Sequence, residues 1–246
     1  MKSFVISILH RLLGYRNYLY VFSVCKISTL WFFRKKWDYL YFVHQLKPEA
    51  NILIIGASTG ITTIPIAKKC NKGKVFAYEP IKDNFDTIKK LIKHYKLNNC
   101  YPYHMALGDI SENSKSMLIP IVKGVTKQGM AHVDVESINK YDKYITVQTE
   151  VSRLDEREEL KNIPINGMKL IAENYEFEIL KGAEKTIREY KPVIYCELWD
   201  NEKRNEVIRL IESFGYRSFH RKYGELKTAD INQYRKRNLF FIPINE

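Results

Sequence analysis

Short apolar runs alternate with longer amphipathic stretches along most of the chain after residue 50. The runs are rich in Ile, Val and aromatic residues, as buried strands are, and the stretches between several of them are long enough for helices. Strands joined through such helices run parallel, because the connection must cross over the sheet. The sequence therefore predicts an α/β fold around a mostly parallel sheet. We expect strands at 51–55, 74–78, 101–106, 169–172, 192–197, 216–220 and 238–243, and helices at 61–70, 83–94, 177–188 and 202–214.

Two segments depart from this alternation. Residues 110–150 contain two further strand segments, 116–122 and 144–151, around a polar loop, and we expect this insertion to face the substrate. Residues 1–48 precede the first strand and end at Pro48, where a helix must stop. We therefore divide the chain into an N-terminal helical extension, residues 1–48, and one domain, residues 49–246.

The extension is basic and aromatic. Residues 1–50 hold eight Lys or Arg against two acidic residues, a net charge of +6 and half of the chain's +12. An amphipathic helix of this kind suits the surface of a membrane, and residues 1–45 are candidates for such peripheral contact. The alternative, which we favour, is a helical pair that packs on the domain and partly covers its cleft. No apolar run approaches the roughly 20 residues that span a bilayer, and His10 and Arg11 interrupt the apolar start before it resembles a signal peptide.

The cysteines and the charge exclude some classes of protein and disfavour others. The four Cys form no Cys-x-x-Cys pair and have no His at ligand spacing, which argues against a zinc site, any other metal site and a disulfide scaffold. We expect a reduced, cytoplasmic protein, peripheral at the inner membrane surface if the extension binds lipid. A nucleic-acid partner is unlikely on this sequence, because the positive charge is concentrated outside the segments that form the cleft.

A glycine-flanked loop follows the first expected strand. It reads Gly56-Ala57-Ser58-Thr59-Gly60, and small residues let the backbone approach a ligand closely. The next strand ends in Glu79-Pro80, 19 residues after Gly60, where a carboxylate can hold the ribose hydroxyls of a nucleotide. Taken alone, the loop could be a plain turn and Glu79 a surface glutamate. The loop and the glutamate together predict an adenosine-type cofactor.

Two families open with such a loop. A short-chain dehydrogenase would need a third glycine where this chain has Thr62, and its only Tyr-x-x-x-Lys pair, Tyr223 and Lys227, comes far too late. The chain instead resembles the FkbM family of S-adenosylmethionine-dependent methyltransferases over roughly residues 50–245. The matching motifs are Ile54-Ile55-Gly56-Ala57-Ser58-Thr59-Gly60, Glu79-Pro80-Ile81-Lys82-Asp83-Asn84-Phe85, Ala106-Leu107-Gly108-Asp109, Leu154-Asp155, Lys169–Ala183 and Pro192-Val193-Ile194-Tyr195-Cys196-Glu197.

The resemblance implies a class I methyltransferase fold, which is a Rossmann-like sheet of seven strands with the last one antiparallel and helices on both faces. It also implies S-adenosylmethionine as the cofactor. The residues that it implies for binding this cofactor are Gly56, Ala57, Ser58, Thr59, Gly60, Glu79, Pro80 and Ala106.

The chain departs from the family pattern at two acidic positions and one glycine. Ile54 and Ile171 replace motif aspartates, and Asn174 replaces a glycine. An isoleucine cannot accept the hydrogen bonds that the first aspartate would accept from the ammonium group of the cofactor. What remains near the expected cleft is Lys169, Glu173 and Glu176.

Methyl transfer to a hydroxyl needs a base that removes the proton. Glu173 is the first candidate and Glu176 the second, although both could simply be carboxylates in the first turn of a helix. His104 and His132 are secondary candidates. The predicted function is O-methylation of a sugar hydroxyl or of a glycolipid or polysaccharide precursor, with a catalytically degenerate, cofactor-binding scaffold as the alternative.

Overall fold

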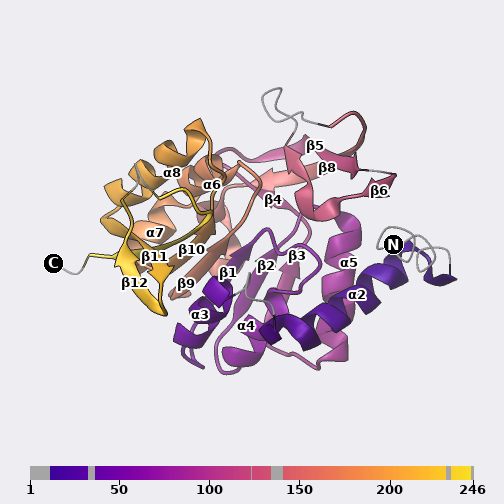
Figure 1. Cartoon of the computed structure of the whole chain (residues 1–246), viewed down its shortest axis with the longest axis horizontal. Helices are drawn as coiled ribbons and strands as arrows, with labels where there is room; N and C mark the ends of the chain where they lie inside the picture. The colour runs from indigo at the N-terminus through magenta and orange to yellow at the C-terminus, as the bar shows by residue number, and fades with distance from the viewer. Residues whose placement is uncertain (1–11, 33–36, 123, 134–140, 231–233, 245–246) are drawn as a thin grey trace.

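The computed structural model describes residues 12–32, 37–122, 124–133, 141–230 and 234–244. Its central sheet has eight strands in the order β12-β11-β13-β10-β9-β1-β2-β3 (Figure 1). Six of them run in one direction, and β13 runs antiparallel to both of its neighbours, β10 and β11. The strands are β1 (Ile52–Ile55), β2 (Val75–Tyr78), β3 (Cys100–Tyr103), β9 (Gly167–Leu170), β10 (Val193–Glu197), β11 (Tyr216–Lys222), β12 (Glu225–Thr228) and β13 (Asn238–Pro243).

This arrangement confirms the predicted seven-stranded sheet with its last strand antiparallel. The eighth strand, β12, was not predicted. It forms because Tyr223 and Gly224 both take positive φ angles, 53° and 91°, and turn the chain back in a tight hairpin.

Two layers of helices cover the sheet (Figure 1). Successive side chains of β1 point to opposite faces: Leu53 and Ile55 enter the core that contains α6, α7 and α8, and Ile52 and Ile54 enter the core beneath α3, α4 and α5. Burial on both faces explains why this strand is entirely apolar. The helices are α3 (Trp37–Gln45), α4 (Thr63–Lys69), α5 (Lys82–His94), α6 (Glu176–Gly182), α7 (Glu184–Tyr190) and α8 (Glu202–Ser213).

The predicted helix 177–188 is instead two helices, α6 and α7, which meet at Ala183. The Asp155 carboxylate accepts hydrogen bonds at 2.9 Å from the backbone N–H groups of Lys185 and Thr186, in the first turn of α7. A side chain distant in sequence therefore caps the second helix, which local periodicity cannot reveal. The prediction of Asp83 as the cap of α5 is also wrong, because α5 begins one residue earlier, after Ile81.

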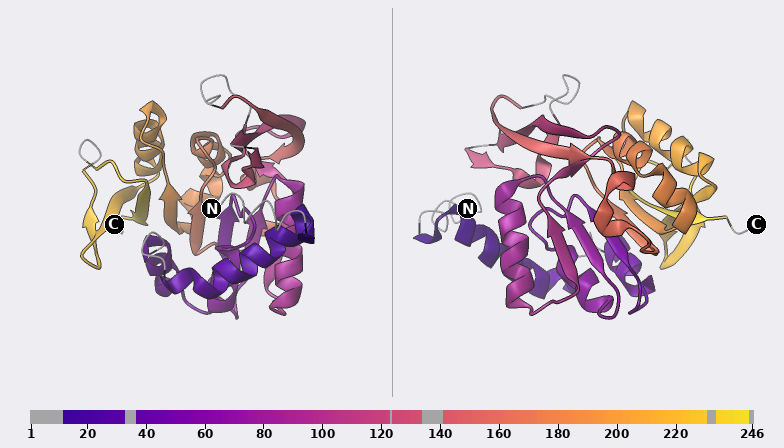
Figure 2. Two further views of the ribbon diagram at one scale, coloured as in Figure 1. Left: turned by 45° about the vertical axis from the view of Figure 1, so that its right-hand side comes forward. Right: turned by 180° about the vertical axis from the view of Figure 1, so that it is seen from behind.

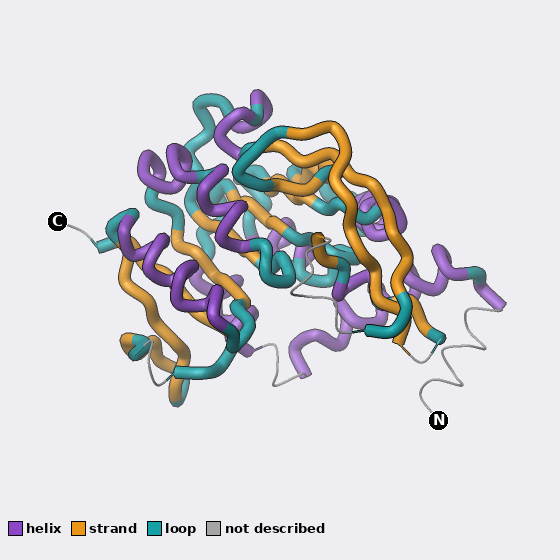
Figure 3. Tube along the Cα trace, turned by 90° about the horizontal axis from the view of Figure 1, so that it is seen from above, coloured by secondary structure: helices purple, strands orange, loops and turns teal. Residues whose placement is uncertain are grey.

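The insertion forms a second sheet at one side of the central sheet, seen from above in Figure 3. Both predicted segments are strands, and they pair as an antiparallel ladder. The end of the predicted strand 101–106 also belongs here, as β4. The strands are β4 (Ala106–Leu107), β5 (Glu112–Val122), β6 (Val125–Thr126), β7 (His132–Val133) and β8 (Tyr144–Ser152).

The N-terminal extension packs on the domain through α2 (Tyr15–Thr29) and the short helix η1 (Leu30–Phe32). Helix α2 runs along the outside of the molecule beside α5 (Figure 2, left). Arg16 Nε donates to Asp83 Oδ1 at 2.8 Å, and Tyr20 Oη lies 2.8 Å from His94 Nδ1. Within the described ranges, no helix combines the length and apolarity needed to cross a bilayer.

Candidate active site

The loop after β1 takes the conformation that its glycines permit. Gly56 and Gly60 have φ angles of 73° and 84°. A Cβ atom on Gly56 would lie 1.8 Å from the carbonyl oxygen of Ile171, so no other residue fits there. Ser58, between the glycines, also has a positive φ of 51°, and its backbone N–H points to the end of β2.

That N–H group donates to Glu79, whose carboxylate is only 4% exposed. Glu79 Oε2 accepts from Ser58 N at 2.7 Å, and Oε1 accepts from Ile81 N and Asn84 Nδ2, both at 3.0 Å. Burial raises the pKa of Glu79, while these three donors and the charge of Lys169 oppose the rise. A carboxylate has about four lone-pair directions, so one on Oε2 remains for a hydroxyl of a ligand.

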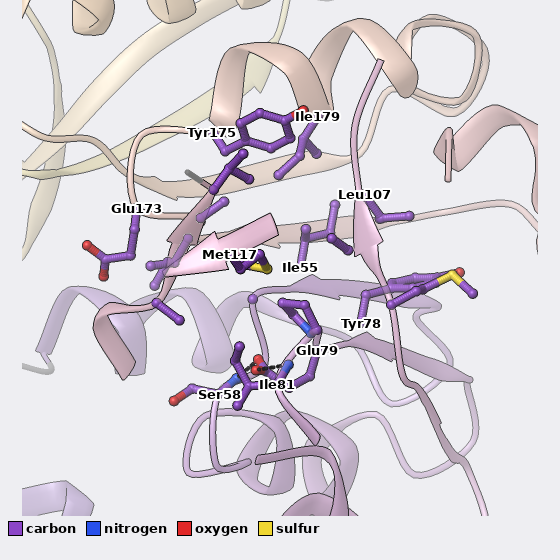
Figure 4. A pocket seen from close by; sticks show the side chains of 18 of the residues that line it. Ile55, Ser58, Tyr78, Glu79, Ile81, Leu107, Met117, Glu173, Tyr175 and Ile179 are labelled. Carbon is purple, nitrogen blue, oxygen red and sulfur yellow. Dashed lines mark hydrogen bonds between the residues drawn. The ribbon is translucent and has the colours of Figure 1, made fainter. Parts of the chain in front are cut away.

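A cavity lies directly above Glu79, which we call the adenosine cavity (Figure 4). Apolar side chains form most of its wall, and Gln128 adds a polar group from the insertion. Gln128 Nε2 donates to Asp83 Oδ2 at 3.2 Å, whereas Gln128 Oε1 is buried and has no partner among the described residues. Lining residues include Ile55, Gly56, Ser58, Tyr78, Glu79, Pro80, Ile81, Met105, Ala106, Leu107, Met117, Gln128, Gly129, Ile171, Glu173 and Tyr175.

These groups fit an adenosine-containing cofactor. The apolar wall can take the flat base, the buried amide oxygen can accept from its amino group, and Glu79 can accept from a ribose hydroxyl. Of the eight predicted cofactor residues, Gly56, Ser58, Glu79, Pro80 and Ala106 line this cavity. Ala57 and Thr59 line the neighbouring cavity, and Gly60 lines neither and serves the turn of the loop.

The second cavity, which we call the acceptor cavity, adjoins the first. Phe22 and Lys26 of helix α2, with Leu30 of η1, form one wall. The other walls come from the glycine loop and from the ends of β9 and β10, where Glu173 and Glu197 lie. Gly56, Ser58, Gly129, Ile171 and Glu173 line both cavities, so the two share a boundary.

Glu173 lies at this boundary, and its neighbours include a second carboxylate, Glu197. Its Oε2 accepts from Trp199 Nε1 at 3.0 Å. Glu197 lies 3.7 Å from Arg237 Nη1, and the Arg237 guanidinium lies 4.3 Å from the centre of the Trp199 ring. Burial, followed by the negative charge of Glu197, raises the pKa of Glu173 to about 7. A carboxyl group that titrates near neutral pH can accept and release a proton during a reaction.

Glu176, the second candidate base, has a different environment. It is 2% exposed, and its Oε1 accepts from the backbone N–H of Ala172 at 2.8 Å. Burial raises its pKa to about 7 as well. Glu176 lines neither cavity, so its carboxylate holds the turn between β9 and α6 and does not face the cleft.

Of the remaining candidates, Lys169 lies in the cleft and the two histidines lie elsewhere. Lys169 is 2% exposed, lines the acceptor cavity and donates from Nζ to the Gly56 carbonyl oxygen at 3.2 Å. His104 is exposed and stacks on Phe85. His132 is 3% exposed, and its Nδ1 lies 3.0 Å from the Met130 carbonyl oxygen. The structure brings neither histidine to the lining of either cavity.

The residues that replace motif positions lie in different parts of the structure. Ile54 is fully buried in the core, beside Lys169 in the sheet register, and lines neither cavity. Ile171 lines both cavities, so it alone of the two changes the surface of the cleft. Asn174 has a φ of 75°, a conformation that glycine and asparagine tolerate best, which explains a glycine in the family pattern at this position.

Several cleft residues were missed by sequence reasoning. Glu197 could have been found, because it ends an expected strand at the edge where ligands bind. Gln128, Phe22 and Lys26 carry no such signal, since their place depends on how the insertion and the extension dock on the domain. Among the described residues, no group of three or more His, Cys, Asp or Glu side chains could hold a metal ion.

Solved structures that resemble this chain include proteins named as methyltransferases. The methyltransferase FkbM from Methylobacillus flagellatus KT is 14% identical, with a TM-score of 0.51 over 80% of this chain and 44% of that one. An rRNA methylase from Streptococcus thermophilus is 11% identical, with a TM-score of 0.48 over 84% and 94%. Fibrillarin from Aeropyrum pernix, with natively bound S-adenosyl-L-methionine, is 9% identical, with a TM-score of 0.44 over 80% and 68%. At these identities the likeness concerns the fold alone.

A search of curated protein sequences finds no significant match. The family model of the methyltransferase FkbM domain, in contrast, matches residues 55–218, which is more than half of the chain. The predicted methyltransferase class and its cofactor, S-adenosylmethionine, are confirmed at the level of the family. The fold, the glycine loop with its buried glutamate and this match lead to one conclusion: the chain belongs to the FkbM methyltransferase family.

Proposed function

We propose that this protein transfers a methyl group from S-adenosylmethionine to a hydroxyl group of a sugar or of a glycolipid or polysaccharide precursor. One observation carries the proposal. Glu173, a carboxyl group with a pKa near neutral, stands on the boundary between a cavity that fits adenosine and a second cavity with polar and aromatic walls.

The adenosine cavity holds the cofactor. Glu79 would accept a hydrogen bond from a ribose hydroxyl, and Gln128 Oε1 would accept one from the amino group of the base. Apolar side chains such as Ile81 and Met105 would hold the base itself. When bound, S-adenosylmethionine supplies an electrophilic methyl group.

The acceptor cavity orients the hydroxyl group. Glu173 removes the proton from this oxygen as the oxygen attacks, and becomes a neutral carboxylic acid. Glu197 lies next to Arg237, and its negative charge makes Glu173 a stronger base. General-base catalysis of this kind contributes about 100- to 10,000-fold to a rate.

The lining of the acceptor cavity suits a polyol. Two carboxyl groups, Glu173 and Glu197, can accept from several hydroxyls, and the Phe22 ring offers an apolar surface to the face of a sugar. We place the reaction in the cytoplasm, in agreement with the four cysteines, which form no disulfide.

The test is methyl transfer from radiolabelled S-adenosylmethionine to a panel of nucleotide sugars, lipid-linked saccharides and polysaccharide fragments. We expect Glu173→Gln to lower the transfer rate at least about 100-fold while S-adenosylhomocysteine binds as in the wild type by calorimetry. Glu178→Gln is the control, because this carboxylate pairs with Lys203 and lines neither cavity. Equal rates in the wild type and Glu173→Gln would refute the role of Glu173.

The position of Ile171 favours a second candidate function, a scaffold that binds the cofactor without turnover. This apolar side chain lines both cavities where the family pattern has an aspartate. Binding of S-adenosylhomocysteine without transfer to any acceptor of the panel would support the scaffold and contradict the enzyme.

A further inference from the structure

Exposed apolar side chains are concentrated in the N-terminal extension. The described residues include twelve large hydrophobic side chains that are exposed, and seven of them lie between residues 12 and 37. The other five are scattered over the rest of the chain. The seven are Leu12, Leu13, Val21, Phe22, Trp31, Phe32 and Trp37, with exposed fractions from 36% for Leu13 to 84% for Phe32.

Helix α2 packs on the domain through buried side chains that include Leu19 and Ile27. Its exposed positions are mostly polar, but Val21 and Phe22 are 42% and 37% exposed, and Trp31 and Phe32 in the adjoining η1 are 62% and 84% exposed. A helix that only covered the domain would carry polar residues at such positions. These apolar side chains are therefore available to contact something else, and we call Val21, Phe22, Trp31 and Phe32 the outer patch.

The charge of the sequence segment that contains the outer patch indicates the nature of its partner. Residues 1–50 carry a net charge of +6, so the partner is negatively charged. Lys26 lies 5.6 Å from the centre of the Phe22 ring, and Arg16 keeps 68% of its side chain exposed although it pairs with Asp83. Exposed Trp and Phe rings next to basic side chains are the groups that enter the interface of an anionic bilayer.

We propose that the outer patch of α2 and η1 docks on the surface of an anionic membrane. The acceptor cavity lies at this same surface, because Phe22 is both an exposed member of the patch and a wall of that cavity, together with Lys26 and Leu30. Packing of α2 on the domain and contact with a membrane are thus not alternatives, since the buried side chains of this segment serve the first and its exposed side chains the second. If the proposed function holds, the acceptor is lipid-linked and reaches the cavity from the plane of the membrane.

The test is sedimentation of the full chain with vesicles of phosphatidylcholine alone and with about a third of phosphatidylglycerol, a fraction large enough to give the surface a negative potential. We expect binding to the anionic vesicles only, and binding that weakens as salt is raised. The triple variant Val21→Ser, Trp31→Ser and Phe32→Ser should bind at least about tenfold more weakly, since it removes three apolar anchors. None of these three residues lines the acceptor or adenosine cavity.

The matched control is the triple variant Ile110→Ser, Tyr223→Ser and Ile244→Ser, which removes exposed apolar side chains elsewhere on the molecule. It should bind vesicles as the wild type does, and both variants should keep their affinity for S-adenosylhomocysteine, which shows that they are folded. No binding to anionic vesicles, or equal loss in both variants, would overturn the proposal. So would a dimer in light scattering that the outer-patch substitutions dissociate, because the patch would then join two copies of the chain. Vesicle binding without methyl transfer would leave the docking surface and refute only the proposed reaction.

Discussion

Each of the two cavities contains a glutamate near the carboxyl end of a strand, buried in the case of Glu79 and half-buried in the case of Glu173, and the neighbours of these glutamates differ. Glu79 in the adenosine cavity accepts three hydrogen bonds from the surrounding chain. Glu173 at the acceptor cavity accepts one from Trp199 and faces a second carboxylate, Glu197. Burial raises the pKa of both groups, and the donors around Glu79 oppose that rise.

This difference separates binding from chemistry within one cleft. A carboxylate whose ionised form is held by several donors is a fixed acceptor and suits the recognition of a cofactor. A half-buried carboxylate with one donor and a like charge nearby, such as Glu173 with its pKa of about 7, exchanges its proton close to neutral pH and suits a base. The following predictions test this difference between the two glutamates.

The largest effect is expected for Glu79→Ala. The substitution leaves three backbone or amide donors without their acceptor, and each buried donor left unpaired costs about 1–3 kcal/mol. We expect the Kd of S-adenosylhomocysteine to rise at least about 100-fold, measured by calorimetry. Glu79→Gln keeps the shape and one acceptor and should have a smaller effect. An unchanged Kd in Glu79→Ala would show that the adenosine cavity is misassigned.

The next prediction concerns stability and pH. The folded-state pKa of Glu173 is raised from an ordinary value of 4.5 to about 7, so ionisation between these values destabilises the folded state. Relative to Glu173→Gln, the wild type should lose on the order of 1–3 kcal/mol of unfolding free energy as the pH rises from about 4.5 to above 7. Urea unfolding across this range measures the loss, with Glu206→Gln, an exposed carboxylate, as the control. A constant difference between wild type and Glu173→Gln would mean that Glu173 titrates normally.

A smaller effect is expected for Glu197→Gln, which removes the negative charge that raises the pKa of Glu173. The pKa of Glu173 should fall by about half a unit to one unit. Carbon-13 NMR of glutamate carboxyl groups measures the change, and the Glu173→Gln spectrum assigns the signal. A pKa of Glu173 that stays the same or rises would contradict the coupling of the two carboxylates.

The smallest effect is expected for Gln128→Leu. The amide oxygen of Gln128 is buried in the adenosine cavity without a partner, so a ligand donor there adds one hydrogen bond. Its loss should weaken S-adenosylhomocysteine binding about three- to tenfold. Gln148→Leu, at an exposed residue of the same insertion, should leave the affinity unchanged. Equal affinities in the two variants would remove Gln128 from the cofactor site.

Much of the fold, together with the glycine loop and the strand-end glutamate of the cleft, could be predicted from local patterns. Strands such as Ile52–Ile55 are buried on both faces and therefore appear as continuous apolar runs. Gly56 and Glu79 were predictable because a close backbone approach and a strand-end carboxylate each require a specific residue type. The division of 177–188 into two helices was not, because Asp155 caps the second helix from 30 residues away.

The sheet, the glycine loop and the carboxylate that follows it could be predicted from the sequence, because each depends on residues close together in the chain. Which of the candidate glutamates faces the cleft depends on tertiary contacts. Glu173 and Glu176 are three residues apart, yet one borders both cavities and the other holds a backbone turn. The pKa of Glu173, and the wall that α2 gives to the acceptor cavity, depend on charges and surfaces that distant segments bring together, and electrostatic and packing forces act through space and not along the chain.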